Sequence, residues 1–318
     1  MLAPPIEPPL KCPRLGRDAP CRANFGAVFW VAVCCAPQLM LMRARKPGAW
    51  GFPLAFVAVV CWSLPARSLA ITFSFTNANV LVIQDSTNPP TPALPYPSTN
   101  LVTGLTGMVV VKATVTLQGL THGFPSDIEM LLVGPGGQES LLMAQVGGQN
   151  KFSVTNLNVT LDDQAANYLP VYTNLQSGTF KPTNGYFFLD GTTNLLGDLP
   201  PPAPTGNSNA VASLSMFQGT DPTGAWRLFV VDDAAPNAGA LSNGWSLHLS
   251  VAVPLAVRRT QTTVVLSWTN AVQGCTLQAT PNLSLGWTNV LPAPVVVAGR
   301  YTVTNPIVGA TLYYRLAK

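Results

Sequence analysis

Five aspartates carry most of the chemistry that this sequence offers. Asp162 and Asp163 form one adjacent pair, Asp232 and Asp233 form another, and Asp127 stands before an apolar run. Both pairs follow alternating apolar segments and precede turn-forming residues, which places them at strand ends. Calcium takes about six to eight oxygen ligands from carboxylates, amides and backbone carbonyls. The spacing alone leaves two interpretations open: a calcium site, or solvated side chains that cap turns.

Motifs of common enzymatic sites are absent from the sequence. It contains two histidines, His122 and His248, but neither a Gly-x-Ser-x-Gly nor a His-Glu-x-x-His motif. His248 follows Trp245 by three residues in an alternating segment, so we expect it on the solvated face of a strand. A Ser-His-Asp triad built on His122 stays conceivable, because triad residues meet in space and not in sequence. With no supporting motif, the sequence predicts a protein that is not an enzyme and has no catalytic residues.

The elements that must position these residues are short strands. From Ile71 onward, apolar and polar residues alternate, β-branched and aromatic side chains are frequent, and Pro- and Gly-rich turns separate the segments. This pattern predicts an all-β protein whose first domain is a jelly-roll β-sandwich, with no helix. The segments expected to form strands are 71–75, 109–117, 152–161, 226–230 and 245–251.

A change of composition near Val253 and Pro254 predicts a domain boundary. We expect the jelly roll over 71–252 and a small C-terminal β-sandwich module over 256–318. The strands expected in this module are 262–268, 274–280, 299–304 and 312–316.

Residues 42–70 have the pattern of a secretory signal peptide. Three basic residues precede a short apolar run, and small residues at Ser68 and Ala70 predict cleavage after Ala70. We therefore expect a secreted or extracytoplasmic protein, with residues 1–41 a leader or the product of a start site placed too early. The apolar run is shorter than the roughly 20 residues of a membrane-spanning helix, so the membrane is involved only before cleavage. An uncleaved anchor is the alternative.

The net charge of +4 comes from the N-terminal residues. Residues 1–70 hold eight of the 17 basic side chains and two of the 13 acidic ones, so 71–318 has nine basic and eleven acidic residues. Without a basic surface to neutralise phosphates, nucleic acid is excluded as a partner. Five of the six cysteines also lie before the expected cleavage site. Cys275 therefore has no partner for a disulfide and is expected to be a buried strand residue.

Two longer segments carry ordered motifs. Segment 119–138 combines a histidine, a short loop, Asp-Ile, an alternating strand and Gly-Pro-Gly-Gly. Segment 217–247 contains Gly-Ala-Trp-Arg-Leu-Phe-Val-Val-Asp-Asp, followed by Gly-Ala-Leu and Trp-Ser-Leu. In order and spacing they resemble the P domain, or Homo B domain, that follows the catalytic domain in kexin- and furin-like proprotein convertases. The resemblance covers about 72–252 and is closest to the stand-alone bacterial variety, which shares the stretch 162–167.

The resemblance implies a jelly roll that often binds calcium at its loop edge. Many members have an aspartate where this chain has Asn237, whose amide oxygen carries no charge and should bind calcium more weakly. Transferred residue by residue, the implied metal ligands are Asp127, Asp162, Asp163, Asp232, Asp233 and Asn237.

The resemblance also implies a role beside a protease, because in convertases the P domain stabilises its catalytic neighbour. No subtilase domain is recognised in this sequence, so we expect a secreted, non-catalytic, calcium-binding protein that binds an extracellular protein or a polysaccharide. The alternative is an accessory P domain acting with a separately encoded subtilisin-like serine protease. Tyr168, Tyr172 and Tyr186 are expected in exposed loops, where they either stack on sugar rings or pack locally.

Overall fold

The computed structural model describes residues 70–85, 90–148, 152–191, 197, 199–307 and 312–317. The expected leader and signal peptide therefore lie outside the described residues, except for Ala70. No helix in the described part has the length and apolar character needed to cross a membrane. Strands supply nearly all of the regular structure, which confirms the all-β prediction.

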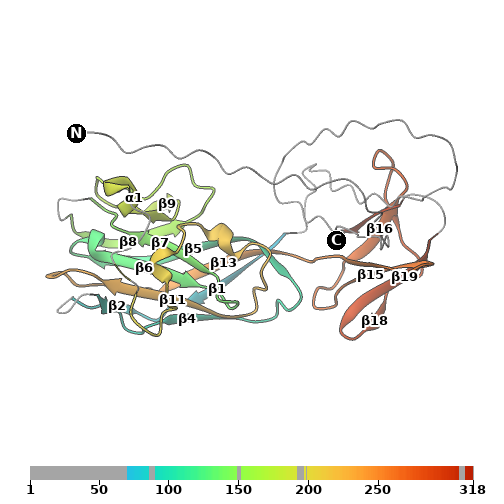
Figure 1. The fold of residues 1–318 in the computed structure, drawn as a ribbon, viewed down its shortest axis with the longest axis horizontal. Coiled ribbons are helices and arrows are strands. Elements are labelled where there is room, and N and C mark those ends of the chain that lie inside the picture. Colours follow the sequence, from blue (N-terminus) through green and yellow to red (C-terminus); the bar gives the residue numbers. More distant parts are fainter. Residues whose placement is uncertain are drawn as a thin grey trace, which may run out of the picture. The chain divides into compact units, whose positions relative to one another are not determined.

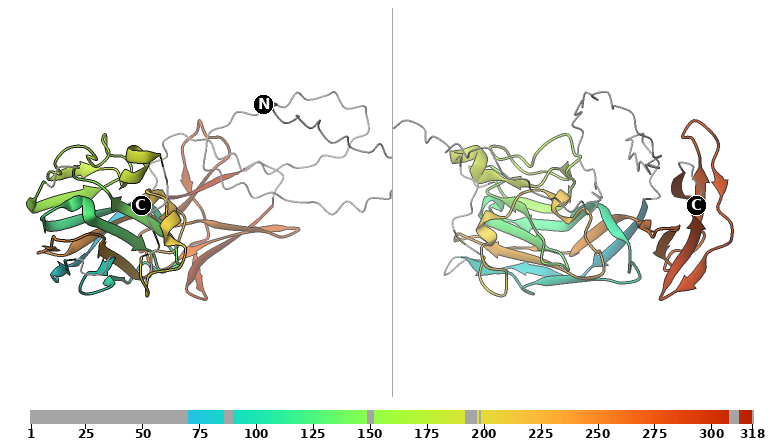
Figure 2. Two further views of the ribbon diagram at one scale, coloured as in Figure 1. Left: turned by 60° about the vertical axis from the view of Figure 1, so that its left-hand side comes forward. Right: turned by 45° about the vertical axis from the view of Figure 1, so that its right-hand side comes forward.

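Two sheets form the larger sandwich, and the ribbon views show them as stacked layers (Figures 1 and 2). The first sheet consists of β1 (Ile71–Asn77), β2 (Leu81–Ile83), β5 (Val109–His122), β8 (Val154–Leu161), β9 (Gly178–Phe180), β12 (Gly239–Leu241) and β13 (Trp245–Ala252). Its order is β1-β13-β5-β12-β2, with β8 also paired to β5 and β9 paired to β8.

The second sheet covers the first. It consists of β3 (Thr91–Pro92), β4 (Ser98–Val102), β6 (Ile128–Val133), β7 (Glu139–Ala144), β10 (Thr183–Asn184) and β11 (Gly224–Asp232). Its order is β10-β7-β6-β11-β3, and β4 also pairs with β11. The strands expected from the alternating segments are all present, with bounds that differ by a few residues.

Short helices interrupt the loops. They are η1 (Pro125–Asp127), α1 (Gly185–Asp190), η2 (Asn207–Asn209) and η3 (Leu214–Phe217). The sequence did not predict α1, because six residues are too few to show a helical period. Its ends are nevertheless well defined: the Asn184 side chain accepts the Tyr186 N–H, and Gly191 ends the helix in the left-handed region with φ 80°.

Both faces of the second sheet are buried around β6 and β11. Met130 and Leu132 pack into the main core between the sheets. Leu131 and Val133 face the other way and pack, together with Tyr186, into a second core on the outer face. All six residues of β6 are therefore buried, so any polar side chain on this strand lies in apolar surroundings.

The C-terminal module has two small sheets around one core of Leu266, Trp268, Leu277 and Val303. One sheet has the order β14-β15-β19-β18, and the other has the order β17-β16-β20. The bounds are β14 (Ala256–Arg259), β15 (Thr263–Thr269), β16 (Thr276–Thr280), β17 (Thr288–Asn289), β18 (Val295–Val297), β19 (Arg300–Pro306) and β20 (Tyr313–Ala317).

This module also contacts the larger sandwich. Thr269 Oγ1 donates a hydrogen bond of 3.0 Å to the Thr106 carbonyl, and Val272 packs into the main core. Cys275 touches both cores, but it is only partly buried and directly precedes β16. The expectation of a buried strand residue at Cys275 is therefore wrong, because strand pairing begins one residue later, at Thr276.

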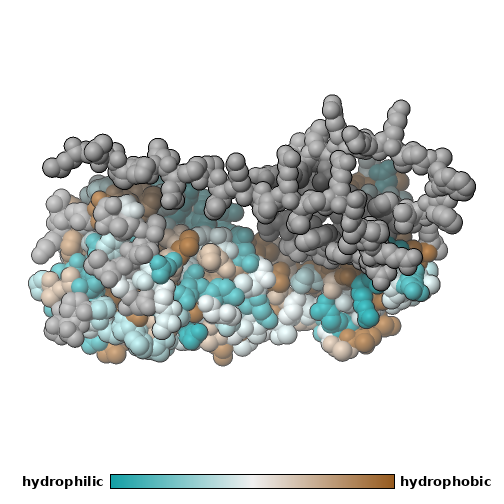
Figure 3. Space-filling view, in the orientation of Figure 1, coloured by the Kyte–Doolittle hydropathy of each residue, from teal (hydrophilic) through white to brown (hydrophobic). Residues whose placement is uncertain are grey.

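The surface visible in Figure 3 mixes hydrophilic, intermediate and hydrophobic residues, with the hydrophobic ones scattered among the others. Such scattered apolar residues are normal on a protein surface.

Candidate functional site

Four carboxylates meet where β6 begins and β11 ends. Asp127 and Glu129 flank Ile128, Asp232 is the last residue of β11, and Asp233 follows it. The antiparallel register places Asp232 opposite Ile128, and the Asp233 N–H donates to the Asp127 carbonyl at 2.8 Å. Asp127, Glu129 and Asp232 are each at most 5% exposed. Asp233 is partly buried. Neighbouring strands thus hold a largely buried acidic cluster, defined here as Asp127, Glu129, Asp232 and Asp233.

Asp232 faces the first sheet across the main core. Its Oδ2 lies 3.1 Å from His122 Nε2, and its Oδ1 accepts the Ala234 N–H at 3.0 Å. The other ring nitrogen, Nδ1, accepts the Phe124 N–H at 3.1 Å, so the ring proton lies on Nε2 and is donated to Asp232. Because both ring nitrogens are engaged, His122 has none to offer a serine hydroxyl, as a Ser-His-Asp triad requires.

His248 is found where the sequence places it, on the outer face of β13. Its Nδ1 lies 2.8 Å from Ser74 Oγ, whereas Trp245 on the same strand is fully buried.

Glu129 and Asp233 share a hydroxyl on the other face of the sheet. The Tyr186 hydroxyl lies 3.3 Å from Glu129 Oε1 and 3.4 Å from Asp233 Oδ2. Tyr186 is 6% exposed, so its expected exposure in a loop is wrong: its ring belongs to the second core, and its hydroxyl faces the two carboxylates. The other two tyrosines do lie at the surface, with Tyr168 52% and Tyr172 61% exposed.

Gln145 completes the polar surroundings of the cluster. Its Nε2 lies 3.2 Å from the Tyr186 hydroxyl and 3.4 Å from Asp233 Oδ2, and its Oε1 accepts the Ser126 hydroxyl at 3.0 Å. Gln145 has φ 50°, which is uncommon for a residue with a side chain. A Cβ at position 185 would clash with the Gln145 carbonyl, so Gly185 permits the close approach that brings Tyr186 to this site.

Burial perturbs two of the carboxyl groups. Loss of solvent raises the pKa of Glu129 to about 8, and the nearby charge of Asp233 adds to the rise, while the bond from Tyr186 opposes it. Loss of solvent also raises the pKa of Asp233 to about 6, with further contributions from Asp127 and Asp232, opposed by bonds from Tyr186 and Gln145. The neutral donors Tyr186 and Gln145 offset this rise only in part, so Glu129 and Asp233 bind protons more strongly than free carboxylates do.

Asn237, one of the residues that the resemblance implied as metal ligands, lies at the border of the cluster. Its Nδ2 lies 3.4 Å from Asp127 Oδ2. A side chain on Gly123 would collide with Asn237 Oδ1, so the glycine next to His122 makes room for this amide. The amide oxygen is therefore held beside the loop that follows β5.

Asp162 and Asp163 lie elsewhere. Asp162 forms an ion pair of 2.7 Å with Lys112, while Asp163 accepts the backbone N–H groups of Leu214 and Ser215 at the start of η3. Lys112 and His122 are ten positions apart on β5, a separation of about 30 Å along a strand. The six residues implied as ligands therefore fall into two distant groups, and the pair at 162–163 has structural partners of its own.

The fit of a metal ion to the cluster is incomplete as the side chains stand. Among the described residues, no group of three His, Cys, Asp or Glu side chains has the arrangement of a metal site. The available donors are nevertheless carboxylate and amide oxygens, the ligand type that calcium prefers. Binding would require the side chains of Asp127, Glu129 and Asp233 to turn toward one point.

Comparisons with known proteins add little. No protein-family model matches the chain. No curated protein matches it either. Among solved structures, a serine protease of Aeromonas sobria is similar at 15% identity and a TM-score of 0.24, over 58% of this chain and 28% of the protease. The chain thus spans little more than a quarter of that protein, and a similarity this weak supports no statement about fold, activity or partners.

Sequence reasoning missed two members of the site, Glu129 and Gln145, and assigned the third, Tyr186, to an exposed loop. Glu129 had a usable signal, because it is a charged residue inside the apolar run 128–133. Gln145 and Tyr186 had none, since a glutamine after a strand and a tyrosine after a glycine are ordinary loop residues.

Proposed function

We propose that the protein is a secreted, non-catalytic, P-domain-like β-sandwich protein that binds calcium at the acidic cluster and an extracellular protein or polysaccharide elsewhere. The observation that carries the calcium proposal is the gathering of four carboxylates, three buried and Asp233 partly buried, with the raised pKa values of Glu129 and Asp233.

Buried carboxylates that repel one another are stabilised either by protons or by a cation. Asp127, Glu129 and Asp233 would supply charged ligands, and Asn237 a neutral one. Asp232, anchored by His122, adds negative charge beside them. A bound calcium ion would supply the positive charge that Tyr186 and Gln145, the neutral donors to Glu129 and Asp233, do not provide. The chain's own contribution is to hold these oxygens at the junction of β6 and β11.

Thermal melting of chelated and calcium-loaded protein tests this proposal. A ligand that binds only the folded state at a hundredfold excess over its Kd adds about 2.7 kcal/mol to the free energy of unfolding. For a domain of this size, Tm should rise by about 5–11 °C. Magnesium should do much less, because it requires a tighter octahedral shell. Asp127→Asn, Asp232→Asn and Asp233→Asn should each shrink the calcium-dependent shift.

Asp163→Asn is the matched control, because Asp163 caps η3 far from the cluster. This variant should melt earlier than the native chain but keep the full calcium shift. If calcium leaves every melting curve unchanged and elemental analysis finds no metal, the cluster is a protonated buried network and the calcium proposal is wrong.

A further inference from the structure

A second polar feature lies on the open side of the larger sandwich, between the edges of its two sheets. β1 pairs only with β13, and β4 pairs only with β11, so each of these strands is an edge of its sheet. Edge strands carry backbone N–H and C=O groups that have no ladder partner. An open surface pocket of about 620 Å³ lies here.

The two edges are joined at one point by Asn77. Its Nδ2 donates to Ser98 Oγ at 3.2 Å and to the Thr99 carbonyl at 3.0 Å, and its Oδ1 accepts the Asn79 N–H at 3.0 Å. The Trp245 indole also donates to Ser98 Oγ, at 2.9 Å. At this point, hydrogen bonds that cross between the sheets pair the Asn77 amide with Ser98 Oγ and with the Thr99 carbonyl.

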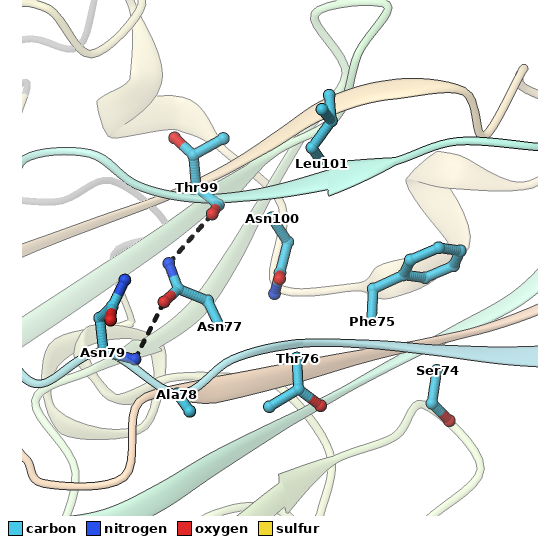
Figure 4. A pocket seen from close by; sticks show the side chains of 9 residues that line it. All are labelled: Ser74, Phe75, Thr76, Asn77, Ala78, Asn79, Thr99, Asn100 and Leu101. Carbon is cyan, nitrogen blue, oxygen red and sulfur yellow. Dashed lines mark hydrogen bonds between the residues drawn. The ribbon is translucent and has the colours of Figure 1, made fainter.

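Two positions further along β4, no such hydrogen bond is made by the side-chain nitrogen of Asn100. Asn100 is 4% exposed, and its Nδ2 is buried without a hydrogen-bond partner in the described part of the chain. Figure 4 shows Phe75 and Asn77 pointing from β1 toward β4, with the Asn100 amide between them, whereas Ser74 and Thr76 point away. A phenyl ring cannot accept this N–H as a carbonyl would. An unpaired buried amide destabilises a fold, and a leucine of similar size would avoid that cost.

The pocket has a chemical character that selects its ligand. Its nine lining residues, which run from Ser74 to Asn79 and from Thr99 to Leu101, carry no charge. Asn79 is exposed at the rim, and Phe75 presents a partly buried ring. Amide groups that both donate and accept, next to an apolar ring, match a molecule with many hydroxyls and apolar C–H faces.

We propose that the pocket between β1 and β4 binds a neutral saccharide unit of a polysaccharide. A sugar hydroxyl would supply the acceptor that Asn100 lacks once this buried side chain turns toward the pocket. The amide of Asn79 bonds a second hydroxyl, and the part of the Phe75 ring that is not packed against the main core contacts the sugar's C–H face. This assignment rests on the proposed function, since it names polysaccharide as the partner class. Its site is separate from the acidic cluster, so the saccharide assignment and the calcium proposal are tested by different measurements.

Affinity electrophoresis of the full chain in gels that contain laminarin, hydroxyethylcellulose or galactomannan tests the assignment. The native chain should be retarded by at least one of these neutral polysaccharides, equally with and without chelator. Asn100→Leu should weaken that binding by about tenfold or more without lowering Tm, because it removes an unpaired amide. Asn79→Ala should weaken binding in the same gels. Because Asn79 is exposed, this variant tests the site even if Asn100→Leu misfolds.

Two control variants locate the binding. Thr72→Val, at an exposed residue of the same strand that does not line the pocket, should bind like the native chain, and so should Tyr172→Ala on the exposed loop surface. Retardation by none of the three polysaccharides would overturn the assignment, as would full binding by both Asn100→Leu and Asn79→Ala. Loss of polysaccharide binding only in Tyr172→Ala would contradict the assignment and indicate binding at the exposed tyrosines. Retardation only by alginate and only with calcium would indicate bridging at the acidic cluster instead.

Discussion

The Glu129→Gln variant removes a buried ionisable group while keeping a side chain of the same length. Glu129 is 5% exposed, and its Oε1 accepts the Tyr186 hydroxyl at 3.3 Å, a role that a glutamine oxygen can also fill. Burial raises the pKa of Glu129 from 4.5 to about 8. Between these two values, the chelated folded chain holds a proton that the unfolded chain has released.

The sign of the effect follows from this difference in bound protons. Because the folded state binds the extra proton, the contribution of Glu129 to stability is fully present below pH 4.5 and is lost as the pH rises toward 8. Each pH unit in that window costs about 1.4 kcal/mol, so the loss reaches about 3 kcal/mol near pH 7. Asp233, whose pKa rises to about 6, adds a loss of the same sign at lower pH.

Glutamine does not titrate, so the free energy of unfolding of the variant does not fall with pH in the way assigned to Glu129. In chelator, Glu129→Gln should melt about 6–12 °C above the native chain near pH 7 and close to it at pH 4. In calcium the order should reverse, because the variant has lost a charged ligand. Thermal melts by circular dichroism from pH 4 to 8.5 measure both effects. The exposed Asp85→Asn is the control and should follow the native curve. A variant less stable than the native chain throughout the chelated series would refute the reasoning.

Three further predictions concern other parts of the fold. His122→Phe should lower the free energy of unfolding by about 2–4 kcal/mol, because it leaves the fully buried Asp232 without its side-chain donor; urea melts measure the loss, and an unchanged midpoint would contradict it. Asp163→Asn should lower Tm equally with chelator and with calcium, because its partners are the N–H groups of η3; a calcium-dependent difference would return it to the metal site. Limited proteolysis should cut the chain near 252–260 and leave a stable fragment of about 180 residues; cuts scattered through 71–252 would count against the expected boundary.

The sequence by itself determined the fold class and the location of most strands. Alternation of period two identifies β5 and β13 and even assigns His248 to the outer face, because side-chain direction in a strand is a local property. The motifs around Asp127 and Asp232 also placed these carboxylates at strand ends, where the structure has them.

Only the tertiary structure decided which residues share a site. Asp162 and Asp163 look equivalent to Asp232 and Asp233 in sequence, yet β5 separates the two pairs by about 30 Å, with Lys112 near one end and His122 at the other. Glu129 became a buried acid because α1 and its Tyr186, 57 positions away, cover the outer face of β6. The unpaired amide of Asn100 likewise depends on which residue of β1 lies opposite it. Contacts of this kind are set by how the sheets pack and in which register, which no local pattern encodes.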